Sequence, residues 1–307
     1  MTTLPTSETF AAPAPAPAPL EVGRSNEATR HAWVQQTLQR LPRGARLLDA
    51  GAGEQRFRPF CDHLRYVAQD FAQYDGKGDG SALQSARWDQ TKTKLDIVSD
   101  ITAIPQFDAS FDAVLCTEVF EHLPDPLAAL REFARLLKVG GHLILTAPFC
   151  SLTHMAPFHF ASGFNRYFYA THLPAHGFEI LEMQENGNFF EYLAQELRRL
   201  RGVAARYAGE AFDEAEGAAV HTVMSALQRL SAKDVGSKEL LCFGYHVLAR
   251  KTASVKPAQT PKAQPQTIPA KPQPATPPDA WLGSLNQALR ATARRQPPPS
   301  QNLTPEP

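Results

Sequence analysis

Residues 46–53 read Arg-Leu-Leu-Asp-Ala-Gly-Ala-Gly and place two glycines directly after a short apolar run. The run from Arg46 to Ala50 suits a buried β-strand. Gly51 and Gly53 lack a β-carbon, so the backbone can turn tightly there and approach a ligand closely. A strand that ends in such a turn is typical of the cofactor-binding edge of an open α/β sheet.

Strand and helix signals alternate along the rest of the chain. Further strands are expected at residues 66–70, 96–99, 111–116, 142–147, 178–183 and 241–249. Helices are expected at 26–41, with Ser25 as N-cap, and at 125–138, where Gly140-Gly141 should stop the helix and open the next strand. The alternation predicts an α/β fold: a Rossmann-like, doubly wound, mostly parallel seven-stranded sheet with helices on both faces. One of the late strands is a candidate antiparallel member.

Proline usage marks the domain boundaries. Of 26 prolines, five lie in residues 1–19 and thirteen in residues 252–307. Stretches of this composition bury too little apolar surface to offset the entropy of ordering them. We therefore expect a disordered Ala/Pro-rich segment at 1–22, one folded domain at 23–251 and a disordered tail at 252–307. A helical insertion is expected within the domain at about 188–236, before the last strand.

Composition excludes several classes of function. The formal net charge is zero, so no global field would attract nucleic acid or an anionic membrane. The four cysteines form no CxxC pair, and neither a signal peptide nor an apolar run of membrane-spanning length is visible. A cytoplasmic protein that binds neither nucleic acid nor membrane is the expectation.

The residues around the glycine turn distinguish between nucleoside cofactors. Asp70 ends the second expected strand, 17 residues after Gly53, where a carboxylate can accept hydrogen bonds from both ribose hydroxyls. A dinucleotide fingerprint would carry a third glycine at position 56, which is Arg56 here. Asp49 would repel a pyrophosphate but would favour a cofactor with a cationic amino group and a sulfonium. These features disfavour an NAD-linked oxidoreductase.

Three motifs carry a family resemblance. Residues 47–53 (LLDAGAG) resemble motif I of class I S-adenosylmethionine-dependent methyltransferases, residues 110–123 (SFDAVLCTEVFEHL) the fourth strand and following loop of the type 11 branch, and residues 135–141 (RLLKVGG) its helix-to-fifth-strand junction. Val139 stands where a proline is more usual, and Gln55 where motif I usually has a further glycine. The resemblance implies an S-adenosylmethionine-binding enzyme whose cofactor is contacted by Asp49, Ala50, Gly51, Gly53, Asp70, Phe71, Asp100, Ile101, Cys116 and Thr117.

Three histidines are candidates for catalysis on the acceptor side. His122 follows the fourth strand, and His154 and His159 lie in an aromatic loop after the fifth. Each histidine has an alternative structural role in starting a helix or filling a loop. Glu121 and these histidines could share a divalent ion, but their spacing matches no recognised metal motif. No metal site is therefore predicted.

We expect methyl transfer to a small-molecule or carbohydrate acceptor, most readily at a hydroxyl that a general base activates. A non-catalytic methyltransferase-like binding module is the alternative. A short apolar helix at 279–292 is a candidate docking segment for a protein partner. The sequence does not identify the acceptor or the oligomeric state.

Overall fold

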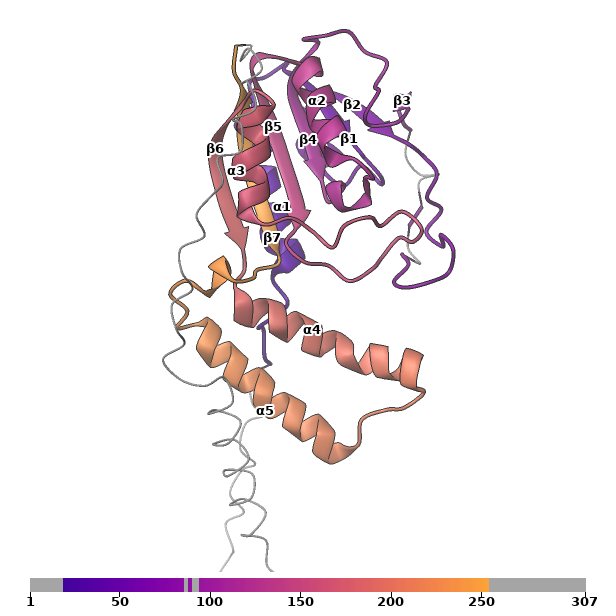
Figure 1. Cartoon of the computed structure of the whole chain (residues 1–307), viewed down its shortest axis with the longest axis vertical. Helices are drawn as coiled ribbons and strands as arrows, with labels where there is room; N and C mark the ends of the chain where they lie inside the picture. The colour runs from indigo at the N-terminus through magenta and orange to yellow at the C-terminus, as the bar shows by residue number, and fades with distance from the viewer. Residues whose placement is uncertain (1–18, 86–87, 90–93, 254–307) are drawn as a thin grey trace, which may run out of the picture. The chain divides into compact units, whose positions relative to one another are not determined.

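The computed structural model describes residues 19–253 except 86–87 and 90–93. Its sheet has seven strands in the order β3-β2-β1-β4-β5-β7-β6 (Figure 1). The strands are β1 (Arg46–Ala50), β2 (Arg65–Asp70), β3 (Ile97–Val98), β4 (Phe111–Thr117), β5 (Leu137–Pro148), β6 (Phe178–Asn186) and β7 (Gly244–Lys251). The main helices are α1 (Asn26–Gln39), α2 (Pro126–Leu136), α3 (Arg166–Ala175), α4 (Phe189–Val203) and α5 (Glu214–Ser231).

The sheet confirms the predicted fold class. β1 pairs in parallel with both β2 and β4, and β4 pairs in parallel with β5. β7 is antiparallel to both of its neighbours, β5 and β6, which identifies the expected antiparallel member. Because the chain order reverses between β1 and β4, the topological switch point lies at the carboxyl end of β1, where open α/β sheets bind ligands.

Helices cover both faces of the sheet, with α2 and α3 in front of it and α1 behind it in Figure 1. Successive side chains of a strand point to opposite faces. In β4, Val114 and Cys116 pack into the cluster that contains Phe133 of α2 and Tyr169 of α3. Leu115 of the same strand joins the other cluster, with Trp33, Val34 and Leu38 of α1.

Two predicted helix ends differ in the structure. The N-cap of α2 is Asp125, whose side chain accepts from Ala128 N, but the helix ends at Leu136 and β5 begins at once. Gly140-Gly141 therefore lies inside β5 and does not end the helix. A register shift between Phe111 and Ala113 accommodates the glycines as an irregularity in the β4–β5 ladder.

Ser25 does not cap α1 through its side chain. The residue lies in the helical region with φ −80° and ψ −11°, and its hydroxyl makes no capping hydrogen bond. A residue with helical dihedral angles does not hold its side chain over the first amide groups as an N-cap does. At the start of the helix, Thr29 N donates a hydrogen bond to Ser25 O at 2.9 Å.

The helical segment after β6 forms a pair, α4 and α5, joined through a π-helical turn, η4 (Ala204–Ala208). Figure 1 shows both helices beyond the lower ends of β5 and β6. Val22 is only 2% exposed and packs with Leu20 against this pair. The packed region therefore begins before the predicted boundary at residue 23.

No helix in the described part of the chain is long and apolar enough to cross a membrane. The candidate docking segment at 279–292 and most of both predicted terminal segments lie outside the described residues.

Candidate functional site

A cavity of about 760 Å³ opens at the carboxyl ends of the parallel strands. Its walls come from the turn after β1, the segments that follow β2, β3 and β4, and the 149–165 loop after β5. The volume falls within the range of about 300–1,000 Å³ that is usual for small-molecule sites.

The turn after β1 is held in a conformation that only glycine adopts easily. Gly51 has φ +75° and Gly53 has φ +48°. The amide of Gly51 donates to the carbonyl oxygen of Gln69 at 2.9 Å, which ties the turn to β2. A β-carbon on Gly51 would stand 2.6 Å from the side chain of Val119, so the turn and the segment after β4 approach closely.

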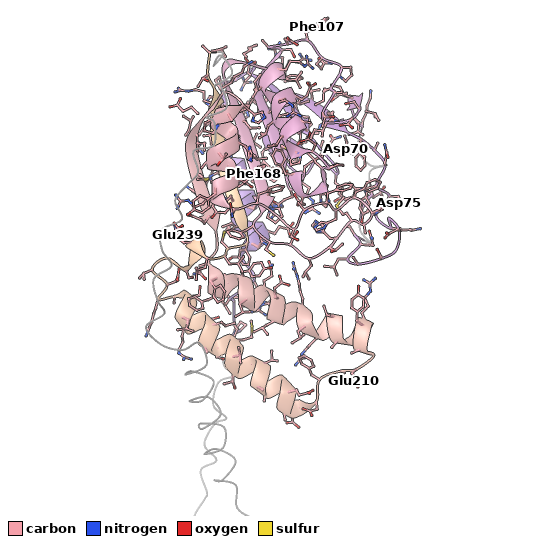
Figure 2. The ribbon with its side chains drawn as sticks, in the orientation of Figure 1. Asp70, Asp75, Phe107, Phe168, Glu210 and Glu239 are labelled. Atoms are coloured by element: carbon pink, nitrogen blue, oxygen red, sulfur yellow. The ribbon has the colours of Figure 1, made fainter. Side chains whose placement is uncertain are left out.

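Asp70, the last residue of β2 (labelled in Figure 2), fixes that turn from the other side. Its carboxylate is 4% exposed and accepts from Gly53 N at 2.9 Å and from Ala72 N at 2.8 Å. Each of these bonds uses a different oxygen. A carboxylate has about four acceptor positions, so both oxygens keep capacity for donors in the cavity.

Asp49 lines the cavity from the end of β1 and is almost fully buried. Burial, with a smaller contribution from the nearby Asp70, raises the pKa of its carboxyl to about 7, although a hydrogen bond from the Tyr66 hydroxyl opposes the shift. A cation in the cavity would favour the ionised form. The structure thus places an acid beside the glycine turn. A positively charged ligand group would stabilise the ionised form of this acid.

Eight of the ten predicted cofactor contacts line the cavity, and Ala50 and Cys116 do not. The side chains of these two residues are fully buried in the core on the α2 and α3 side of the sheet. Strand alternation sends them there while Asp49 and Thr117 face the cavity. Burial also raises the pKa of the Cys116 thiol well above its usual value, so Cys116 is an inert core residue.

The three predicted histidines come together although His122 lies more than thirty positions from the other two. The ring centroids are 4.7 Å apart for His122 and His154, 4.9 Å for His154 and His159, and 6.0 Å for His122 and His159. His122 and His154 line the cavity, whereas His159 is not among its lining residues. The 149–165 loop brings the cluster together because Phe160 N donates to Glu121 O at 2.9 Å.

Backbone carbonyls set the tautomers of the two lining histidines. His122 Nδ1 lies 2.5 Å from Phe158 O, and His154 Nδ1 lies 2.9 Å from Leu152 O. A carbonyl oxygen only accepts, so Nδ1 carries the hydrogen in both rings and Nε2 keeps its lone pair. Burial, with His154 next to it, lowers the pKa of His122 to about 4, so this imidazole is neutral at neutral pH.

Many residues that line this cavity were not predicted from the sequence, Glu118 and Trp88 among them. Glu118 follows β4 with φ +54°, and its carboxylate pairs with Arg30 of α1 at 3.2 Å and accepts from Thr146 Oγ1 at 2.9 Å. Its place directly after a buried strand was the available signal. Trp88 lies under Gly53 in a stretch with no strand or helix pattern, so nothing in the sequence pointed to it.

A family model described as "Methyltransferase domain" matches residues 24–201. The chain is 47% identical over 57 residues to a ubiquinone biosynthesis O-methyltransferase of Xanthomonas oryzae pv. oryzae (strain PXO99A), covering 19% of this chain and 23% of that protein. It is 38% identical over 108 residues to the same-named protein of Xanthomonas axonopodis pv. citri (strain 306), covering 34% and 44%. The chain thus matches less than half the length of these curated relatives.

Among solved structures, the YcgJ protein of Bacillus subtilis is similar at 13% identity. The alignment covers 74% of this chain and all of that one, with a TM-score of 0.44.

Proposed function

Because the chain belongs to the family of S-adenosylmethionine-dependent methyltransferase domains, we propose that it transfers the methyl group to a hydroxyl of a small-molecule or carbohydrate acceptor. The histidine cluster of His122, His154 and His159 carries this proposal. It adjoins the cavity that holds the glycine turn, and at least one neutral Nε2 lone pair there is available to an acceptor hydroxyl.

The residues around the glycine turn fit the cofactor. Asp70 keeps acceptor capacity for two ribose hydroxyls while the amides of Gly53 and Ala72 hold it in place. The buried Asp49 suits the cationic amino group of the methionine end, because that charge would favour its ionised form. Ile101 and Asp100 line the cavity after β3, where we place the adenine.

S-adenosylmethionine supplies a methyl group on a sulfonium sulfur, which keeps the electron pair of the carbon–sulfur bond when the methyl group leaves. The protein has to align the acceptor oxygen with that carbon and exclude water. Phe71 and Phe158, whose rings stand edge to face at 5.1 Å, form an apolar wall suited to both tasks. The hydroxyl proton passes to the neutral imidazole cluster.

Two observations favour a small acceptor. The cavity volume suits a small molecule beside the cofactor. The formal net charge of zero provides no overall positive field to attract a nucleic acid. The curated relatives named above as O-methyltransferases support oxygen as the methyl acceptor.

The test is release of S-adenosylhomocysteine by the full-length chain across matched panels of phenols, saccharide alcohols and amines. We expect turnover with hydroxyl compounds and its loss in His154→Ala, with cofactor affinity retained. Turnover confined to amines, or hydroxyl turnover that His122→Ala and His154→Ala both leave unchanged, would overturn the proposal.

A further inference from the structure

Three side chains at the acceptor end of the cavity form a cluster of possible metal ligands. One carboxylate oxygen of Glu121 and one ring nitrogen each of His122 and His154 all lie within 4.8 Å of one another. We propose that these three residues bind one divalent transition-metal ion, which holds the acceptor hydroxyl beside the cofactor. The role in catalysis rests on the proposed function, whereas the binding of the ion does not.

The distances suit a single ion. Glu121 Oε1 lies 3.8 Å from His122 Nε2 and 4.0 Å from His154 Nε2. Metal–nitrogen and metal–oxygen bonds of about 2.0–2.2 Å allow two ligands of one ion to stand up to roughly 4 Å apart. An ion between these atoms therefore requires only a small approach of the two imidazoles toward each other.

The two imidazoles are already oriented as ligands. Each donates its Nδ1 hydrogen to a backbone carbonyl, Phe158 O for His122 and Leu152 O for His154. Metal-binding histidines usually carry such a second hydrogen bond, which fixes the tautomer and directs the other nitrogen at the ion. Here both Nε2 atoms lie within 4.0 Å of the same oxygen of Glu121.

Glu121 is the strongest indication of a cation. Its side chain is 1% exposed; Oε1 lies nearest the two imidazoles, and the other oxygen, Oε2, has no hydrogen-bond partner among the described residues. Burial, with the nearby Glu118, raises the pKa of this carboxyl well above its usual value, so the ionised form needs a positive charge beside it. Arg30, which contributes a favourable field, is engaged by Glu118 at 3.2 Å. A metal ion would supply the charge that the protein itself does not place beside Glu121.

The backbone holds this carboxylate beneath the cavity. Glu121 belongs to the short helix η3 (Phe120–His122), and its carbonyl oxygen accepts from Phe160 N at 2.9 Å and from Ala161 N at 3.2 Å. His122 and His154 line the cavity above it. The remaining coordination positions of the ion would therefore face the cavity, where an acceptor oxygen can occupy one.

The donor set indicates the kind of ion. One carboxylate and two imidazoles suit Zn²⁺, Mn²⁺ and related first-row ions better than Ca²⁺, which prefers oxygen ligands alone. A coordinated hydroxyl loses its proton more readily. With the ion bound, both Nε2 lone pairs are used, so the proton passes to His159 or to water. The oxygen then forms its bond to the methyl carbon.

The experiment uses the full-length chain, without a histidine tag and treated with a chelator, titrated with Mn²⁺ and with Zn²⁺ by calorimetry. We expect one ion per chain, and Mn²⁺ electron paramagnetic resonance should report nitrogen ligands. Glu121→Gln and His154→Ala should each weaken binding by at least about 100-fold, since even outer-shell changes cost 10- to 100-fold. The exposed control variants Glu210→Gln and His221→Ala should bind as the wild type does.

His154 is partly exposed, so His154→Ala should retain the fold and keeps the test valid if Glu121→Gln does not fold. Failure of the wild-type chain to bind either ion, or equal binding by His154→Ala, would overturn the site. Metal binding without hydroxyl methylation would support the site and contradict the proposed function. Hydroxyl methylation that is unaffected by chelator, with no metal bound, would support the proposed function and contradict the metal site.

Discussion

The Asp70 carboxylate accepts a hydrogen bond from the Gly53 amide at 2.9 Å, across 17 positions of sequence. This contact joins the end of β2 to the turn that follows β1, at the switch point of the sheet. The same carboxylate accepts from Ala72 N with its other oxygen. One acid thus both shapes the turn and presents acceptors to the cavity.

Asp70→Asn should weaken binding of S-adenosylmethionine by on the order of 100-fold, because hydrogen bonds to charged groups contribute about 1.5–3 kcal/mol each. Isothermal titration calorimetry measures this loss. Asp75→Asn is a matched control: its carboxylate also accepts from two backbone amides, but it lies on an exposed loop away from the cavity lining (Figure 2). Equal affinities in the two variants would contradict the assignment of Asp70 to the cofactor.

Gly51→Ala should lower the free energy of unfolding by about 1–3 kcal/mol, the usual cost of overpacking, and should weaken cofactor binding. The new methyl group would meet the stiff, branched side chain of Val119 at 2.6 Å. Gly44→Ala is the control because Gly44 also has a positive φ, of +79°, but a β-carbon there meets nothing within 4 Å. Denaturant unfolding measures the free energy of unfolding of both variants. Both share the cost of a positive φ, so a larger loss in Gly51→Ala reports the contact with Val119. Equal losses would argue against close packing at Gly51.

Asp49 should make the stability of the cofactor-free protein depend on pH. Its folded pKa of about 7 lies above the ordinary value of 3.8, so between these values the folded protein holds a proton that the unfolded chain has lost. Stability from this group is therefore present at acidic pH and is lost as pH rises toward 7. Asp49→Asn should flatten the fall in melting temperature between pH 5 and pH 8, which scanning calorimetry records.

Cofactor binding should release the proton from Asp49, because the cationic amino group favours the carboxylate. Calorimetric titrations at pH 6 in buffers of different ionisation enthalpy count the protons released. The wild type should release more protons than Asp49→Asn does. Identical proton counts, together with an unchanged pH profile of stability, would show that Asp49 does not titrate as the structure indicates.

His154→Ala should reduce kcat by about 100-fold or more, in the range of general acid–base effects, while the dissociation constant of the cofactor stays the same. Only kcat should change because His154 lies at the acceptor end of the cavity, where its ring centroid is 4.7 Å from that of His122. His221→Ala, on the exposed surface of α5, should change neither quantity. A parallel loss of cofactor affinity in His154→Ala would instead give the residue a structural role.

The sequence predicted the fold because the strands of the sheet are short apolar runs between clear turn signals. It misplaced the end of α2 because glycine pairs often stop helices, whereas Leu137 is needed opposite Phe111 in the sheet. Pairing across strands is a tertiary constraint that helix signals do not contain. The same limit explains Ser25, a favourable capping residue whose backbone remains helical.

The candidate site was also predicted only in part. Asp49, in the glycine-turn motif, and Asp70, at the end of the second predicted strand, reach the cavity because each lies at the carboxyl end of its strand. Cys116 fell on the wrong face because adjacent strand residues alternate, and the resemblance assigned it by position alone. The grouping of Glu121, His122 and His154 depends on how the 149–165 loop folds back onto η3, which spacing along the chain does not reveal.

The most direct test of methyl transfer to a hydroxyl is to supply S-adenosylmethionine labelled with ¹³C in its methyl group and to analyse the product by NMR. Incubation with the hydroxyl and amine panels shows which atom receives the label, because methyl groups on oxygen, nitrogen and carbon differ in chemical shift. We expect a methyl ether from the wild-type chain and its loss in His154→Ala. A label found on nitrogen or carbon, or no transfer to any hydroxyl while the chain binds the cofactor, would contradict this expectation.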